Sequence, residues 1–132
     1  MSITIYHNPN CGTSRNVLAI IREFYGEPEI VEYVNEGWTR EQLVELFATA
    51  KLTPNEALRA KQAPAEELGL ATASDDTILD AMLEHPILVN RPIVVTENGV
   101  ALCRPSEAVF ALLNLPSGTT FTKEDGEEII AP

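Results

Sequence analysis

Cysteine is scarce in this sequence, and long apolar runs are missing. With only Cys11 and Cys103 among 132 residues, the chain cannot form a disulfide-rich scaffold. No stretch approaches the roughly 18 apolar residues of a membrane-spanning helix. The first residues also lack a basic segment followed by an apolar one, so we expect no secretory signal and a cytoplasmic location. In such a reducing compartment both thiols are expected to stay free.

Positive charge is scarce as well. Nine lysines and arginines stand against 20 aspartates and glutamates, which gives a formal net charge of -11. A field of this sign repels nucleic acid and anionic lipid, and no basic run offsets it. We therefore expect neither nucleic acid nor a membrane among the partners. The composition is otherwise ordinary, 45% hydrophobic and 22% charged, which suits a single domain spanning residues 1–132.

The first third of the chain alternates strand and helix patterns. Residues 3–6 form a short β-type run, residues 17–24 place apolar side chains at helical spacing, and residues 30–34 return to a β-type run. A strand, a helix and a second strand in this order predict two parallel strands joined by a right-handed crossover.

The middle of the chain is dominated by patterns that start helices. Thr39 and Thr53 begin sequences of capping-box form, and Ser74 precedes a third helical pattern. Strand patterns are few between about residues 53 and 85. We therefore expect a helical insertion there, between two halves of a sheet.

Two more strands and a helix are predicted after this insertion. Asn98-Gly99 separates two β-branched runs, which is the strongest short-range pattern for a β-hairpin. Pro105 then precedes a helical pattern, and residues 122–125 favour one short turn. The order β-α-β, helices, β-β-α predicts an α/β protein with a thioredoxin-like mixed sheet.

The first candidate site is Cys11, between the first strand and the first helix. Unpaired backbone N–H groups and the positive end of the helix dipole favour a thiolate at such a position. The Ser14 hydroxyl can donate a hydrogen bond to the sulfur, and His7 and Arg15 are near enough in sequence to add positive charge. A lowered pKa would make Cys11 a nucleophile at neutral pH. Two interpretations without catalysis remain. Cys11 could be an incidental residue in a helix-capping turn, and His7 could simply be the residue that ends the strand.

The residues around Cys11 exclude two mechanisms. Three residues after Cys11 the chain has Ser14, so no local Cys-x-x-Cys disulfide can form and an external thiol must resolve any adduct. Six residues after Cys11 stands Val17, so the Cys-x5-Arg loop of phosphatases is absent as well. Cys103 lies in an apolar run and is expected to be a buried core thiol.

Two arginines flank the predicted hairpin. Arg91 precedes its first strand and Arg104 follows its second, so both should reach the same end of the sheet, where a thioredoxin-like fold places the start of the first helix. A guanidinium donates two parallel hydrogen bonds, a geometry that suits a tetrahedral oxyanion. Alternatively, each arginine pairs with a surface carboxylate.

Several segments together resemble the glutaredoxin-coupled bacterial arsenate reductases, over the range from Met1 to about Glu128. The segments are ITIYHNP (residues 3–9), CGTSRN (11–16), EELGL (66–70), HPIL (85–88), NRPIVV (90–95) and CRPSE (103–107). The resemblance implies that Cys11 attacks arsenate, that glutathione acts as co-substrate, and that glutaredoxin then reduces the adduct to release arsenite. It implies no bound cofactor and no metal.

The same resemblance assigns roles to further residues. Arg91 and Arg104 would hold the oxyanion, and Arg59 would stabilise the arsenic intermediate. Arg15 is a further candidate for binding the substrate. His7 and Ser14 would tune the cysteine, and the bond between Arg91 and Pro92 would be cis, as thioredoxin-like folds use there.

Two other functions fit part of the sequence. An Spx-type redox-responsive regulator that binds RNA polymerase shares the expected fold, but such proteins usually carry Cys-x-x-Cys where this chain has Cys11 and Ser14. A glutathione-dependent thiol oxidoreductase without oxyanion chemistry would need Cys11 but neither Arg91 nor Arg104.

Overall fold

The computed structural model describes all residues, 1–132, in two compact units. One unit joins residues 1–32 to residues 91–132, and the other comprises residues 33–90. The strands are β1 (Thr4–Tyr6), β2 (Glu29–Val31), β3 (Ile93–Thr96), β4 (Gly99–Leu102), β5 (Thr120–Thr122) and β6 (Glu128–Ile130). The α-helices are α1 (Gly12–Phe24), α2 (Tyr33–Glu36), α3 (Arg40–Ala50), α4 (Pro54–Ala57), α5 (Asp75–Glu84) and α6 (Val109–Leu113). Short 3-10 turns lie at Leu70–Thr72, Pro86–Leu88 and Ser106–Ala108.

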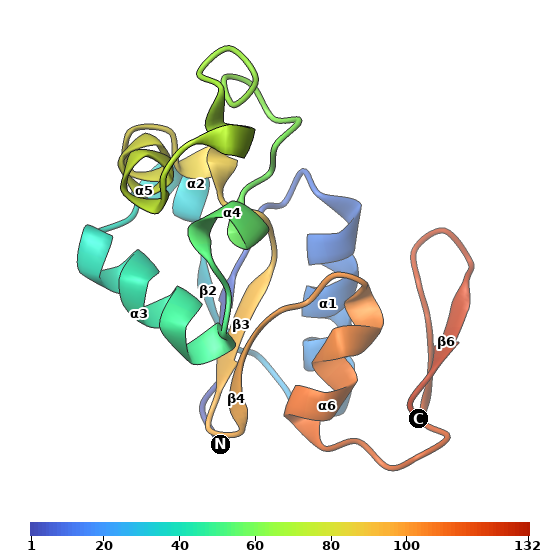
Figure 1. Ribbon diagram of the computed structural model, residues 1–132. Coiled ribbons are helices and arrows are strands. Elements are labelled where there is room, and N and C mark those ends of the chain that lie inside the picture. Colours follow the sequence, from blue (N-terminus) through green and yellow to red (C-terminus); the bar gives the residue numbers. More distant parts are fainter. The chain divides into compact units, whose positions relative to one another are not determined.

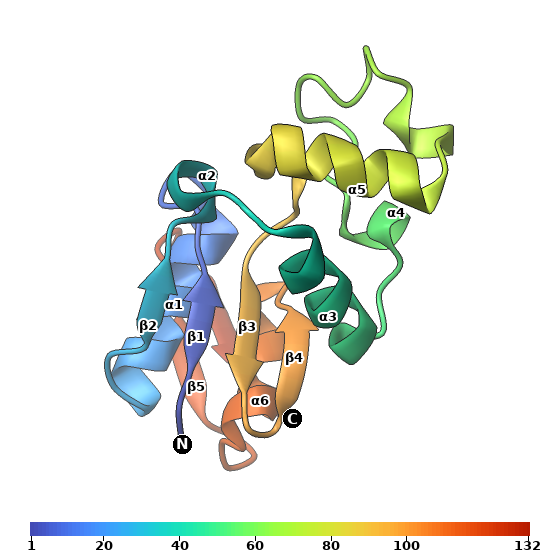
Figure 2. The ribbon, with the colours of Figure 1, turned by 90° about the vertical axis from the view of Figure 1, so that its left-hand side faces the viewer.

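The first unit is built on a four-stranded mixed sheet in the order β2-β1-β3-β4. β1 pairs in parallel with β2, where Ile5 faces Ile30, and antiparallel with β3, where Ile5 faces Val94. β3 and β4 form the predicted hairpin, in which Thr96 faces Gly99. The β-α-β and β-β-α order is confirmed, with α1 and α6 on one face of the sheet (Figure 2).

An apolar core fills the space between this sheet and its two helices. Its buried side chains come from β1, β3, α1 and α6, and they include Ile5, Val17, Ile20, Val94 and Phe110. Each such side chain contributes about 1.5–3 kcal/mol by leaving water. The core therefore fixes α1 firmly against the sheet, and with it the loop that precedes α1.

Cys103 belongs to the same core and is fully buried. Burial raises the pKa of Cys103 to about 12, because no charged partner compensates the loss of water around a thiolate. The thiol is therefore protonated at neutral pH, which confirms its predicted role in packing.

The C-terminal segment forms a β-hairpin that the sequence did not predict. β5 pairs antiparallel with β6, and Phe121 faces Ile129 in that pairing. Ile129 and Ala131 are buried in the core, and the hairpin stands beside α1 and α6 (Figure 1). Its strands have only three residues each, and the turn between them carries Glu124, Asp125 and Glu127, so the β pattern is weak. The predicted short turn at residues 122–125 overlaps the hairpin's own turn.

The second unit, residues 33–90, contains α2 to α5. Thr39 and Thr53 both close capping boxes, and the Ser74 hydroxyl accepts the N–H of Thr77, as the sequence predicted. The helical segment is wider than the expected insertion at 53–85, because α2 and α3 precede it.

The predicted strand at residues 30–34 ends at Val31. Tyr33 begins α2 instead, since its ring is fully buried, its hydroxyl donates to the Val89 carbonyl at 2.7 Å, and it packs against Trp38 at a ring separation of 4.9 Å. These tertiary contacts outweigh the β propensity of the segment. None of the helices has the length and apolar character that a membrane crossing requires.

Candidate active site

Asn8 organises the loop between β1 and α1. Its carbonyl accepts the N–H of Cys11 at 3.0 Å, and its side-chain oxygen accepts the N–H of Asn10 at 2.9 Å. Its own N–H donates to the Ser14 hydroxyl at 3.1 Å. Asn8 is buried, so these bonds hold the loop in one conformation. Asn8 was not among the predicted site residues, although an asparagine before a proline is typical of a turn in which the side chain bonds to the backbone that follows it.

Cys11 is the N-cap residue of α1. Its backbone is extended, with φ -104° and ψ 121°, and its carbonyl accepts the N–H of Arg15 at 3.0 Å. The side chain is half-buried and makes no capping hydrogen bond of normal geometry. The sulfur nevertheless lies at the helix start, close enough to the Ser14 N–H for that group to stabilise a thiolate.

Arg91 and Arg104 meet at this sulfur, as their positions around the hairpin predicted. Arg104 Nη1 lies 3.6 Å from Cys11 Sγ and donates to the Arg91 carbonyl oxygen at 3.0 Å. Arg91 is buried, whereas Arg104 is exposed. The peptide bonds Arg91-Pro92 and Arg104-Pro105 are both cis. Pairing of Ile93 with Leu102 places both arginines at one end of the β3–β4 hairpin.

The charge environment of Cys11 favours its thiolate. Burial is the largest single influence, and by itself it raises the pKa of the thiol. The Ser14 backbone N–H, the Arg104 guanidinium and the Arg91 guanidinium all stabilise the negative sulfur, and together they outweigh burial. The pKa of Cys11 therefore lies below its ordinary value, as a nucleophilic cysteine requires.

His7 and Ser14 form a buried pair behind the cysteine. His7 Nδ1 lies 2.6 Å from the Ser14 hydroxyl, and that hydroxyl already accepts the Asn8 N–H. Burial is the main reason that the pKa of His7 lies below its ordinary value. The charge of Glu32 raises this pKa and the charge of Arg22 lowers it, and both effects are smaller than that of burial. The lowered pKa favours the neutral imidazole, and its Nδ1 shares a hydrogen bond with the Ser14 hydroxyl. The hydroxyl of Ser14 thus has His7 as its close side-chain partner, and the predicted roles of both residues in tuning the sulfur stay predictions.

Arg15 is paired with a carboxylate from the C-terminal hairpin. Its Nε and Nη2 donate to the two Glu124 oxygens at 3.0 and 2.7 Å, and its Nη1 donates to the Pro9 carbonyl at 2.9 Å. Both side chains of the ion pair are 45% exposed. No sequence pattern links Glu124 to this site, because 109 residues separate it from Arg15.

Arg59 belongs to the second unit, residues 33–90, and the predicted role of its side chain stays a prediction. It follows α4 directly, and its N–H donates to the Leu88 carbonyl at 2.8 Å. The side chain is half-buried. No group of three or more histidine, cysteine, aspartate or glutamate side chains lies together in a way that could hold a metal ion.

The chain is similar to proteins named as arsenate reductases. It is 61% identical over 131 residues to arsenate reductase ArsI2 of Synechocystis sp. (strain ATCC 27184 / PCC 6803 / Kazusa), covering 97% of this chain and 93% of that one. It is 50% identical over 131 residues to arsenate reductase of Escherichia coli (strain K12), covering 98% and 93% of the two chains. Among solved structures, arsenate reductase from Vibrio cholerae superposes with a TM-score of 0.78 at 36% identity, over 83% of this chain and 96% of that one.

The sequence likenesses extend over nearly the whole chain. The superposition with a solved reductase confirms the thioredoxin-like fold that the element order predicted. The sequence profile of the ArsC family matches residues 6–112, a range that includes Cys11, Arg91 and Arg104. The chain therefore belongs to the ArsC family.

Proposed function

We propose that this protein is an arsenate reductase in which the Cys11 thiolate attacks arsenate. The observation that carries the proposal is the position of Arg104, whose Nη1 lies 3.6 Å from the sulfur while it also binds the Arg91 carbonyl. Two guanidinium groups thus stand at a nucleophile, where they can bind an oxyanion and neutralise the charge that develops on it. Family membership and the reductases at 50 and 61% identity support the same substrate.

The first steps join two sulfur atoms to arsenic. The Cys11 sulfur forms a bond to arsenic, and one arsenate oxygen leaves as water once it is protonated. The thiol of glutathione then replaces a second oxygen, which also leaves as water. Arg91 and Arg104 would hold the remaining oxygens, and the α1 N-terminus would favour the negative charge. Arg59 is proposed to stabilise this intermediate, on the basis of the family resemblance.

Reduction needs a second external thiol. A glutaredoxin thiolate attacks the glutathione sulfur, forming an S–S bond between the two reductants. The electron pair of the broken As–S bond stays on arsenic, so As(V) becomes As(III). Water then displaces Cys11, which releases arsenite and restores the thiol.

Cys103 supports this dependence on external thiols. It is the second and last cysteine of the chain, it is fully buried, and its pKa is raised to about 12. A thiol that is protonated and covered by core side chains cannot resolve an adduct on Cys11. Glutathione and glutaredoxin are the proposed partners, and the cytoplasm, which maintains both in reduced form, is the proposed location.

The test is arsenate-dependent NADPH oxidation with glutathione, glutathione reductase and glutaredoxin. The native chain and Cys103→Ala should both turn over, whereas Cys11→Ser should be inactive. Arsenite production by the Cys11→Ser variant would contradict the assignment of the nucleophile. Absence of turnover in a folded native chain would favour a thiol oxidoreductase without oxyanion chemistry or a polymerase-binding regulator.

A further inference from the structure

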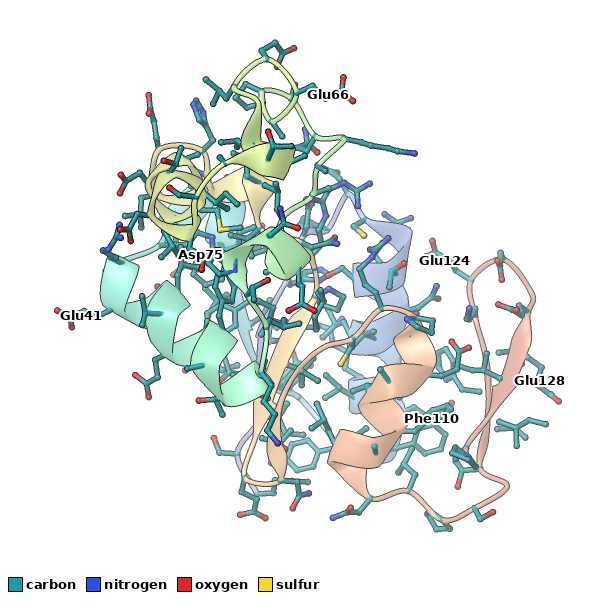
Figure 3. All side chains as sticks on the ribbon, viewed as in Figure 1. Glu41, Glu66, Asp75, Phe110, Glu124 and Glu128 are labelled. Atoms are coloured by element: carbon teal, nitrogen blue, oxygen red, sulfur yellow. The ribbon has the colours of Figure 1, made fainter.

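The turn between β5 and β6 brings Glu124 to the first turn of α1. The Glu124 N–H donates to the Asn16 side-chain oxygen at 2.9 Å, and Asn16 is buried on α1. Burial of Ile129 and Ala131 fixes the hairpin on the same core. Figure 3 shows the Glu124 side chain directed from the turn toward α1. The backbone of Glu124 is therefore held beside α1 by contacts that are independent of Arg15.

The Glu124 carboxylate lies against the residue that follows Cys11. Its Oε1 is 3.1 Å from the position that a Cβ on Gly12 would take, so the absence of a side chain there leaves room for the carboxylate. Both of its oxygens accept hydrogen bonds from Arg15. A tetrahedral oxyanion would use the same two-pronged pairing with a guanidinium.

Arg15 connects Glu124 to the loop that carries Cys11, because its guanidinium donates hydrogen bonds to both. While Nε and Nη2 bind the carboxylate, Nη1 donates to the carbonyl of Pro9, two residues before Cys11. Hydrogen bonds to Glu124 raise the pKa of Arg15, and the charge of Cys11 adds to the effect. By reciprocity, the Arg15 charge favours the thiolate weakly, and the opposite charge of the paired Glu124 carboxylate works against that effect.

We infer that Glu124 is a positioning residue of this site, which holds Arg15 on the cysteine loop and neutralises its charge beside Cys11. Oxyanion binding is thereby left mainly to Arg91 and Arg104. This inference rests on the proposed function wherever it concerns the affinity for arsenate. The other charged groups near Glu124 do not replace it, because Asp125 repels it and Lys123 is paired with Glu107 and Glu127.

The test compares four variants by two measurements. The rate of Cys11 alkylation by iodoacetamide against pH gives the thiol pKa, and steady-state kinetics give the KM for arsenate. Glu124→Gln frees the charge of Arg15, so the thiol pKa and the KM should both fall. Arg15→Gln leaves an unpaired carboxylate, so both should rise. The double variant should return near the native values, and each single change in KM should be about 1.5- to 5-fold, the range of an exposed charge pair.

A matched control is available on the same helix. Arg22 and Glu27 form an equally direct ion pair at 2.8 Å, near the end of α1. Glu27→Gln should leave the alkylation profile and the KM unchanged. If Glu124→Gln and Arg15→Gln shift the thiol pKa and the KM in the same direction, the ion pair is merely structural and the inference is overturned. If neither variant shifts these two quantities, the inference is overturned as well. Alkylation needs no arsenate, so this result stands apart from any failure of the proposed reaction.

Discussion

Replacing Arg104 by glutamine should weaken both the nucleophile and the binding of its substrate. The guanidinium lies 3.6 Å from Cys11 Sγ, and it is exposed, so solvent screens part of the interaction. We assign about 1 kcal/mol to thiolate stabilisation at such a site. Loss of a charge-assisted hydrogen bond to the oxyanion adds about 2 kcal/mol. Together these give about 3 kcal/mol, or roughly a 100-fold fall in kcat/KM for arsenate.

Two assays separate the contributions. Alkylation of Cys11 against pH should show a raised thiol pKa in Arg104→Gln, because a group that stabilises the thiolate is gone. Coupled turnover should show the larger loss in kcat/KM. Arg40→Gln is the matched control, since Arg40 pairs with Asp76 and Asp80 on α5, in the unit that does not contain Cys11. A kcat/KM within about 3-fold of native, with an unchanged alkylation profile, would refute this account of Arg104.

Other predictions concern the buried groups of the site and the helical unit. His7 has a pKa below its ordinary value because it is buried, so the unfolded chain binds a proton first as pH falls through about 6.5. The free energy of unfolding should therefore decrease below that pH, and His7→Asn should remove this part of the pH dependence in urea titrations. Cys103→Ala should keep most of the turnover but lower stability by about 1 kcal/mol, because it leaves a small cavity; complete loss of turnover would reveal a resolving thiol. Thr53→Ala should cost about 1 kcal/mol in thermal unfolding with kcat unchanged, since it removes a capping box.

Structural features that depend on residues close together in the sequence could be predicted. The capping boxes at Thr39 and Thr53 and the hairpin at Asn98-Gly99 depend on local hydrogen bonds and backbone preference, and all of them form. Cys11 at a helix start follows from the same local reasoning. The positions of Arg91 and Arg104 follow from the register of one hairpin, so their meeting at one end was also predictable.

Features that depend on distant contacts could not be predicted. Tyr33 leaves the expected strand because its hydroxyl binds a carbonyl at Val89, 56 residues away. The Ser14 hydroxyl lies 2.6 Å from His7 Nδ1 because the fold buries both side chains together, which no local pattern reveals. Glu124 reaches α1 through a hairpin whose strands have only three residues each, so neither the hairpin nor its contact with Arg15 has a clear sequence pattern.

Because Cys103 is buried, its reaction with a thiol reagent reports when the core of the first unit opens. Cys11 is partly accessible and ready to react with a thiol reagent in the folded protein, whereas Cys103 reacts only when the core around it is exposed. Native protein should therefore take up one equivalent of reagent quickly and a second one at the rate or equilibrium of unfolding. When the core recloses faster than the reagent reacts, the labelling rate of Cys103 in the folded protein, divided by its rate in the unfolded chain, gives the free energy of opening this core, in the native chain and in every variant that retains Cys103.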